Sequence, residues 1–221
     1  MTSERTPVLG VGAGGHAKVV LEILAAVGGY EIVGLLDADA ERTGVTLHGI
    51  PVLGGDELLE AQYHGGVSNA FIGLGGASDT RPRRRLYERV RSVGFDVVSA
   101  VHPSAVVSPS ARIGAGATIA AASVVGPDAT LGEDVIVNTG AVVDHDCRIG
   151  DHVHVAIGAR LASGVTLEDE VHVGAGATVL QGLRIGEGAV IGAGAVVVRD
   201  VDRGVVVVGV PATTLRTVVG S

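Results

Sequence analysis

The chain has 221 residues, which suits one large domain or two small ones, and 24 acidic against 16 basic side chains give a formal net charge of −8. This balance argues against a nucleic-acid binder and against a basic membrane-surface protein, so the expected partners are small molecules or proteins. The single cysteine cannot form an internal disulfide, and no leader-like segment precedes the first apolar run, which predicts a cytoplasmic protein. Aromatic residues make up only 2% beside 35 glycines, which indicates a thin, repetitive structure in part of the chain.

Residues 1–100 alternate between strand-like and helix-like segments. Strands are expected at "PVLGVG", "EIVGLLD", "IPVL", "NAFIGL" and "FDVVSAV", and helices at "HAKVVLEILAAVGG", "GDELLEAQY" and "RPRRRLYERVRSVG". This alternation predicts a small Rossmann-like parallel sheet with helices on its faces.

From Val101 the period changes to six. In 17 consecutive six-residue blocks the first position is Val, Ile or Leu, and the fifth is always small or aliphatic. Such a pattern predicts short strands joined by corners and wound into a parallel β-helix, with three blocks in each coil and positions 1 and 5 facing inward. The expected β-helix domain spans residues 101–221, and "GVVVVGVPATTLRTVV" caps its C-terminal end.

The glycine-rich turn "GVGAGG" lies between the first strand and the first helix, and Asp37 ends the next strand. Taken alone this is a dinucleotide-binding fingerprint. However, only about 90 residues precede the repeat, enough for a single mononucleotide-binding half. Because glycines let backbone amides approach a diphosphate at a helix N-terminus, a nucleotide sugar fits the turn, with a purely structural turn as the alternative.

The segment "VDHDCRIGDHVH", residues 143–154, gathers three histidines and three acids around the only cysteine. His145 falls at an outward corner position, where a neutral imidazole can take a proton near pH 7. Asp144 and Asp146 are equally close to it in sequence, and either carboxylate would raise its basicity. Cys147 falls at an inward position and is expected to pack in the core. Surface positions are expected for the histidines His102, His152 and His172.

Four stretches, in order along the chain, carry a family resemblance: "GVGAGGHAKVV", "HPSAVVSPSARIG", "NTGAVVDHDCRIGDHVHV" and "GVPA". Together they resemble the sugar acetyltransferases of the NeuD and PglD type, in which a nucleotide-sugar domain precedes a hexapeptide-repeat domain. The hexapeptide array also resembles the wider class of left-handed β-helix acyltransferases. That resemblance implies a left-handed winding, acetyl-CoA as co-substrate and a homotrimer.

The resemblance also implies roles for individual residues. His145 would be the catalytic base, Asp146 its supporting acid, and His154 a contact of the acetyl-CoA thioester. The backbone at Ser163, Ala175 and Ala193 would hold the coenzyme. The nucleotide sugar would be bound by the residues Gly14, Gly15, His16 and Asp37. We also expect Ile72 and Gly73 to line that cleft, and Asn138 either to contact the acceptor sugar or to cap a corner. The stretch "GLGGASDTRPRRR" departs from the family's shorter Asn-containing loop, so the base and the sugar stay open.

The predicted function is an acetyl-CoA-dependent N-acetyltransferase that acts on a nucleotide-linked amino sugar by direct transfer, with no metal required. The alternatives are an O-acetyltransferase of a sialic-acid-like sugar, a zinc hydratase, and a non-catalytic nucleotide-sugar-binding solenoid. Zinc would need about three converging histidines, and the gaps between those of residues 143–154 do not resemble the closely spaced ligand pair of the β-helical hydratases.

Overall fold

The computed structural model describes residues 5–76 and 78–217 and contains two compact units. Of the described residues, the first unit comprises 5–75 and Pro82–Pro103, and the second comprises Gly76, 78–81 and 104–217. Gly76 and residues 78–81 therefore belong to the repeat unit, although they lie within the expected α/β stretch of the sequence. A single domain boundary after residue 100 does not account for this short segment.

The first unit is built on one sheet with the strand order β3-β4-β2-β1-β5-β6. All its pairings are parallel except that of β3 with β4. The strands are β1 (Thr6–Val11), β2 (Tyr30–Leu36), β3 (Thr46–Leu47), β4 (Ile50–Gly54), β5 (Asn69–Ile72) and β6 (Asp96–Val97). The helices are α1 (Gly15–Val27), α2 (Leu59–His64) and α3 (Arg81–Val93), with single turns η1 (Ala40–Arg42) and η2 (Asp56–Leu58). The expected strands and helices are present, although the expected helix over residues 55–63 begins as the single turn η2 and the expected last strand is divided into β6 and β7 (Ala100–Val101). Strand β3 and the turn η1 were not predicted.

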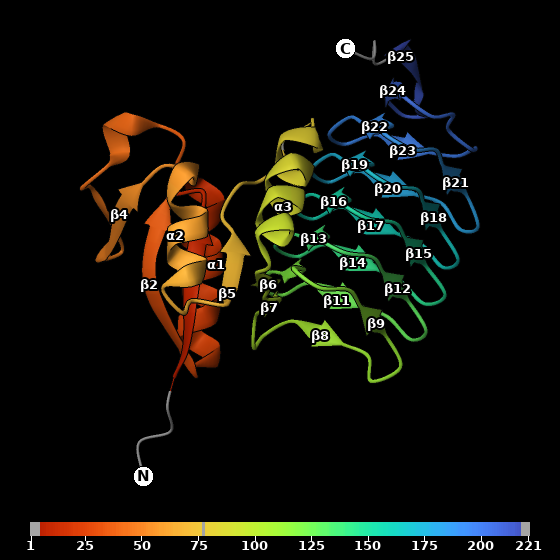
Figure 1. Ribbon diagram of the computed structural model, residues 1–221. Helices are drawn as coiled ribbons and strands as arrows, with labels where there is room; N and C mark the ends of the chain where they lie inside the picture. The colour runs from red at the N-terminus through yellow and green to blue at the C-terminus, as the bar shows by residue number, and fades with distance from the viewer. Residues whose placement is uncertain (1–4, 77, 218–221) are drawn as a thin grey trace. The chain divides into compact units, whose positions relative to one another are not determined.

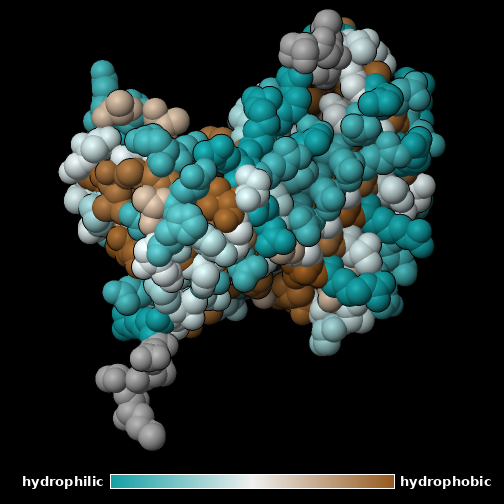
Figure 2. Space-filling model, in the orientation of Figure 1, coloured by the Kyte–Doolittle hydropathy of each residue, from teal (hydrophilic) through white to brown (hydrophobic). Residues whose placement is uncertain are grey.

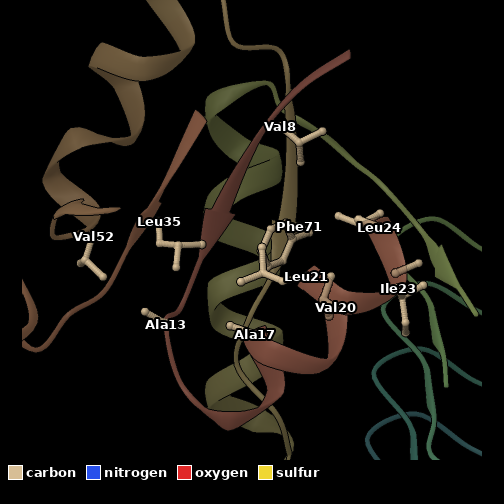
Figure 3. Packing of buried hydrophobic residues seen from close by; sticks show 11 residues of the cluster. Val8, Ala13, Ala17, Val20, Leu21, Ile23, Leu24, Leu35, Val52 and Phe71 are labelled. Carbon is tan, nitrogen blue, oxygen red and sulfur yellow. The ribbon is translucent and has the colours of Figure 1, made fainter. Parts of the chain in front are cut away.

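Helices cover both faces of this sheet because consecutive strand residues point in opposite directions. Val8 packs into the cluster formed with α1, whereas Leu9 packs into the cluster formed with α2 and α3. Figure 3 shows the first cluster, in which Phe71 of β5 lies against Leu21 of α1. Each such side chain contributes roughly 1.5–3 kcal/mol on full burial. A glycine is required at Gly10, because a Cβ there would meet the Phe71 ring at 2.5 Å.

The second unit is a left-handed parallel β-helix of two-residue strands arranged in three sheets (Figure 1). Each residue pairs with the one eighteen positions later, for example Val124 with Val142, so three six-residue blocks make one coil as predicted. Between residues 117 and 197 every aliphatic residue at positions 1 and 5 of the blocks is buried except Leu183, which is half-buried; Ala117 and Ile119 are examples of buried ones. The strands of the first sheet are β10 (Thr118–Ile119), β13 (Ile136–Val137), β16 (His154–Val155), β19 (His172–Val173), β22 (Val190–Ile191) and β24 (Val205–Val208). Those of the second are β8 (Val106–Val107), β11 (Val124–Val125), β14 (Val142–Val143), β17 (Arg160–Leu161), β20 (Thr178–Val179) and β23 (Val196–Val197). Those of the third are β9 (Arg112–Ile113), β12 (Thr130–Leu131), β15 (Arg148–Ile149), β18 (Thr166–Leu167) and β21 (Arg184–Ile185).

Glycine recurs at positions 2 and 4 of the six-residue block because of the backbone geometry at the corners of the β-helix. Position 4 has a positive φ of 56–73° in every block from Gly116 to Gly194, and aspartate, alanine, histidine or glutamate fills it where glycine does not. Position 2 is glycine for another reason: a Cβ at Gly126 would meet the His145 backbone nitrogen of the next coil at 2.7 Å. One glycine therefore supplies a left-handed turn and the other a close approach of two coils.

The predicted C-terminal cap is an antiparallel hairpin. Strand β24 continues the first sheet beside β22, and β25 (Thr213–Thr217) pairs back onto β24. On the face of the repeat unit visible in Figure 2, hydrophilic side chains predominate and apolar residues form patches among them. Among the described residues, no helix has both the length and the apolar character needed to cross a bilayer.

Candidate functional site

The glycine-rich turn between β1 and α1 is shaped by a close approach of two backbone segments. Gly12 has a φ of +95°, and a Cβ on it would meet the backbone of Gly73 and Leu74 at 3.0 Å. A Cβ on Gly73 would collide with the Gly12 carbonyl oxygen. By contrast, a Cβ on Gly14 or Gly15 would meet nothing within 4 Å. Gly12 and Gly73 therefore shape the turn, while Gly14 and Gly15 leave open space beside the amides that begin α1.

Asp37 at the end of β2 holds this turn rather than pointing freely into solvent. Its Oδ2 accepts a hydrogen bond from the Ala13 amide at 2.7 Å, and its Oδ1 accepts one from the Asp39 amide at 3.0 Å. On the other side, Arg42 Nη1 donates to the Ala13 carbonyl at 2.6 Å. Arg42 was not singled out in the sequence, because it lies 29 residues from Ala13 and in no recognisable motif.

A pocket of about 310 Å³ opens beside the turn, within the α/β unit. Gly12 and Asp37 line it, whereas Gly14, Gly15, His16 and Gly73 are not among its lining residues. Its other walls come from residues that sequence reasoning missed: Ala38, Asp56, Leu74, Pro82, Arg85, Leu86 and Arg89. The last four lie at spacings of three and four along α3, so they share one face of that helix, and the period could have revealed them.

His145 lies at an exposed corner of the β-helix, between β14 and β15. Its side chain is 52% exposed, and its Nδ1 lies 2.6 Å from Asp146 Oδ2. Asp144 plays a different part, because its Oδ1 accepts a hydrogen bond from the His145 backbone amide at 2.8 Å. The geometry thus separates two carboxylates that the sequence left equivalent: Asp146 contacts the ring and Asp144 the backbone.

The conformation of Asp146 makes its ring contact possible. Asp146 occupies position 4 of its block with a φ of 58°, a conformation that aspartate tolerates better than most side chains. With Nδ1–H donating to Asp146, the lone pair of His145 is on Nε2, which points away from the carboxylate. The hydrogen bond to Asp146 raises the pKa of His145 above its ordinary 6.5, and the negative charge of Asp144 adds to this rise.

His154 leaves the coil in the outward direction that the six-residue period predicts, but it is buried. Only 8% of it is exposed, and its Nδ1 donates to the carbonyl oxygen of Gly76. Asn138 Nδ2 lies 3.2 Å from His154 Nε2, and Asn138 Oδ1 accepts a hydrogen bond from the Thr139 amide at 2.8 Å. Since Gly76 O can only accept, His154 carries its proton on Nδ1, and Asn138 donates to Nε2.

Two histidines expected at the surface are also largely buried, and that expectation was wrong for both. His152 is 12% exposed in its side chain, and its Nδ1 lies 3.0 Å from the fully buried Asp134 Oδ2. His172 is 8% exposed and meets the His154 ring edge-on at a centroid distance of 5.0 Å. Burial lowers the pKa of His172. The repeat pattern predicts that these side chains leave the β-helix, but it carries no information about what covers them.

The three residues expected to hold the coenzyme fall on two different corners. Ser163 lies eighteen residues after His145, one coil further along the same corner, where the Gly164 amide donates to the His145 carbonyl at 2.9 Å. Ala175 and Ala193 lie on the corner that contains Asn138, one coil apart, and the Gly194 amide donates to the Ala175 carbonyl. Both alanines are exposed. The face of strands β14, β17 and β20 separates the His145 corner from the Asn138 corner.

Cys147 faces the interior of the β-helix, as the repeat predicted. It is fully buried, its Sγ donates to the Ala162 carbonyl at 3.3 Å, and burial raises the pKa of its thiol. Within residues 5–76 and 78–217, no three His, Cys, Asp or Glu side chains are grouped as metal ligands would be.

Two family models match the chain. The model of the PglD N-terminal domain covers residues 8–90, and that of the bacterial transferase hexapeptide, with six repeats, covers residues 146–181 and 164–199. Among solved structures, PerB from Caulobacter crescentus is 42% identical, with a TM-score of 0.88 over 94% of this chain and 96% of that one. The chain belongs to the PglD-type family of hexapeptide-repeat acetyltransferases. Its fold, as the resemblance implied, and its class of enzyme are thereby confirmed.

Further solved structures align with this chain over nearly the same length. The acetyltransferase domain of PglB from Neisseria gonorrhoeae is 38% identical, with a TM-score of 0.88 over 96% of this chain and all of that one. WeeI from Acinetobacter baumannii is 28% identical, with a TM-score of 0.83 over 95% of this chain and all of that one. The PerB structure contains CoA and GDP-perosamine, and a further PglB structure contains acetyl coenzyme A. No curated protein matches the chain.

Proposed function

We propose that this acetyltransferase transfers the acetyl group of acetyl-CoA to the amine of a nucleotide-linked amino sugar, with His145 as the general base. The observation that carries the proposal is the exposed pair of His145 and Asp146, on a chain 42% identical to PerB. PerB binds CoA and GDP-perosamine, and two further structures of that enzyme carry asparagine or alanine in place of one histidine.

In this mechanism Asp146 holds the proton of His145 on Nδ1, so that Nε2 can accept a proton from the attacking amine. The amine nitrogen forms a bond to the thioester carbonyl carbon while Nε2 takes its proton. The carbon–sulfur bond then breaks, and CoA leaves as a thiolate that recovers the proton from the imidazolium. Because the pKa of His145 is raised, its neutral form is a stronger base than an ordinary imidazole. The acetyl group passes directly from the thioester to the amine, so the transfer needs no covalent enzyme intermediate.

We further propose that the active enzyme is a homotrimer in which acetyl-CoA lies between two copies. The support is the placement of the expected coenzyme contacts on two corners of one β-helix, with Ser163 on one and the exposed Ala175 and Ala193 on the other. Ile157, on the same corner as these alanines, is an apolar side chain that is 58% exposed and would be covered by the second copy. Light scattering tests the assembly, and a monomer that retains full activity would overturn it.

The assay for the chemistry measures CoA release with GDP-, UDP- and dTDP-linked 4-amino sugars, and with the matching 4-hydroxy sugars. We expect release with an amino sugar and none with its hydroxyl counterpart. His145→Ala should lose about 10²–10⁴-fold in turnover while acetyl-CoA still binds. His64→Ala, at an exposed histidine at the end of α2, is the control and should keep full turnover. Unchanged turnover in His145→Ala would overturn the role of the base, and release with the hydroxyl sugars alone would favour O-acetylation.

A further inference from the structure

The pocket of the α/β unit contains a carboxylate that the glycine turn does not use. Asp56 begins η2, two residues after the end of β4, and lines the pocket together with Asp37. Both oxygens of Asp37 are occupied by backbone amides. Asp56 is half-buried, and no hydrogen bond reaches its carboxylate within residues 5–76 and 78–217. A ligand that brings N–H donors into the pocket can therefore form hydrogen bonds to this carboxylate in place of water.

The charges nearest Asp56 in the pocket are mostly negative. Burial, the neighbouring Glu57 and the facing Asp37 all raise the pKa of Asp56, and only Arg89 lowers it. A second anion placed there would add to this unfavourable charge, whereas neutral N–H donors would relieve it. A neutral hydrogen-bond donor therefore fits beside Asp56 better than a phosphate group does.

The order of strands places Asp56 where the base of a nucleotide would lie. The glycine turn follows β1, Asp37 follows β2, and Asp56 follows β4, and these three strands are neighbours in the sheet. Ligands of such sheets lie across the carboxyl ends of the strands, with the phosphates at the glycine turn. Asp56 lies two strand spacings, about 10 Å, further along that edge. A nucleoside extended from the turn past Asp37 reaches it with its base.

The remaining walls suit a flat heterocycle. Leu74 and Leu86 supply apolar surface for its faces, and the exposed Arg85 and Arg89 lie one helical turn apart on the same side of α3. Guanine presents adjacent N1–H and N2–H donors on one edge, which a carboxylate accepts as a pair, and its O6 and N7 are acceptors that arginine recognises. Uracil and thymine present one N–H between two carbonyl oxygens, which a carboxylate repels. Adenine and cytosine place a ring-nitrogen acceptor on that edge.

We propose that Asp56 is a specificity-determining residue that selects a guanine nucleotide, by accepting hydrogen bonds from N1–H and N2–H of the base. The inference rests on the proposed function, the use of a nucleotide-linked sugar. It adds the identity of the base of that nucleotide, argued from the residues of this chain. It assigns a role to a residue outside the glycine motif, and it makes GDP-linked sugars the substrate class.

Calorimetric binding of GDP, inosine diphosphate and UDP to the full-length protein tests the proposal without any acetyl transfer. Inosine diphosphate differs from GDP only by lacking the N2 amino group. For the unaltered protein we expect GDP to bind about tenfold or more tightly than either of the others, since the missing donor leaves a charged acceptor unpaired. Asp56→Asn should lose about tenfold to a hundredfold in GDP affinity and bind GDP and inosine diphosphate equally, with UDP affinity unchanged or improved.

Glu60→Gln is the matched control, because it removes one negative charge near Arg89 from a residue that does not line the pocket. It should keep the preference for GDP over inosine diphosphate. Equal affinity of the unaltered protein for GDP and inosine diphosphate would overturn the proposal, and so would a loss in Asp56→Asn that is the same for GDP and UDP. If guanine selection through Asp56 is found but no GDP-linked amino sugar releases CoA, the N-acetyltransferase assignment fails and the base selection stands. If CoA is released from UDP- or dTDP-linked amino sugars in preference to GDP-linked ones, the base selection fails alone.

Discussion

Replacing Asp146 by asparagine separates its effect on His145 into a change of pKa and a change of rate. Asparagine tolerates the left-handed conformation that Asp146 adopts, with a φ of 58°, so the corner should keep its shape. The variant loses the carboxylate that accepts the proton of Nδ1. Because that hydrogen bond is the largest cause of the raised pKa, the pKa of His145 should fall back toward its ordinary 6.5.

The sign of the pH effect follows from which form is active. The neutral imidazole is the base, so kcat/KM rises with pH as His145 loses its proton. In the unaltered enzyme this acid limb lies above pH 6.5, and in Asp146→Asn it should move to lower pH. The plateau at higher pH should fall because the imidazole is less basic and less well oriented. Since the side chains are 52% and 65% exposed, water screens the pair, and we expect a fall of roughly tenfold, less than the ~10²–10⁴ for loss of the base.

The measurement is a pH profile of kcat/KM for CoA release. Asp144→Asn is the control, because it also removes one negative charge beside His145 but leaves the contact with the ring in place. It should shift the acid limb less than Asp146→Asn does. An acid limb that stays in place or moves to higher pH in Asp146→Asn would refute the assignment of Asp146 as the carboxylate that supports His145.

Two further predictions concern the packing of the corner. Cys147 should resist alkylation in the folded protein at mildly alkaline pH, because it is fully buried and its pKa is raised, and it should react on denaturation; labelling at the rate of a free thiol in the folded protein would contradict this. Gly126→Ala should lower turnover about tenfold or more, because the new Cβ would lie 2.7 Å from the His145 backbone nitrogen and must displace the base. Gly150→Ala is its control, since a Cβ there would approach the Asp169 backbone nitrogen of another corner at 2.8 Å. Equal turnover in the two variants, at similar melting temperatures, would refute the link between coil spacing and the position of His145.

The candidate site shows where prediction from sequence ends. The outward direction of His145 and the inward direction of Cys147 follow from the six-residue period, because each position of a block has one direction relative to the coil. The same period sends His154 outward, yet His154 is covered by Gly76, which lies 78 residues earlier in the chain. No local pattern connects these two residues. Sequence reasoning found the residues that a period or a motif marks, and it missed Asp56 and Arg42, which act through segments that only folding brings to the glycine turn.

What the sequence determined by itself is therefore the architecture and the direction of each side chain in the repeat. Each residue of a coil pairs with the residue eighteen positions later in the chain. One strong six-residue pattern therefore specifies every strand and corner. Tertiary structure alone decided which polar groups are occupied. It places Asp146 at the ring of His145, as the family resemblance implied, and Asp144 at the backbone, and among residues 5–76 and 78–217 it leaves the Asp56 carboxylate without a hydrogen bond. The physical reason is that a hydrogen bond depends on the positions of two atoms about 3 Å apart, and sequence spacing does not contain those positions.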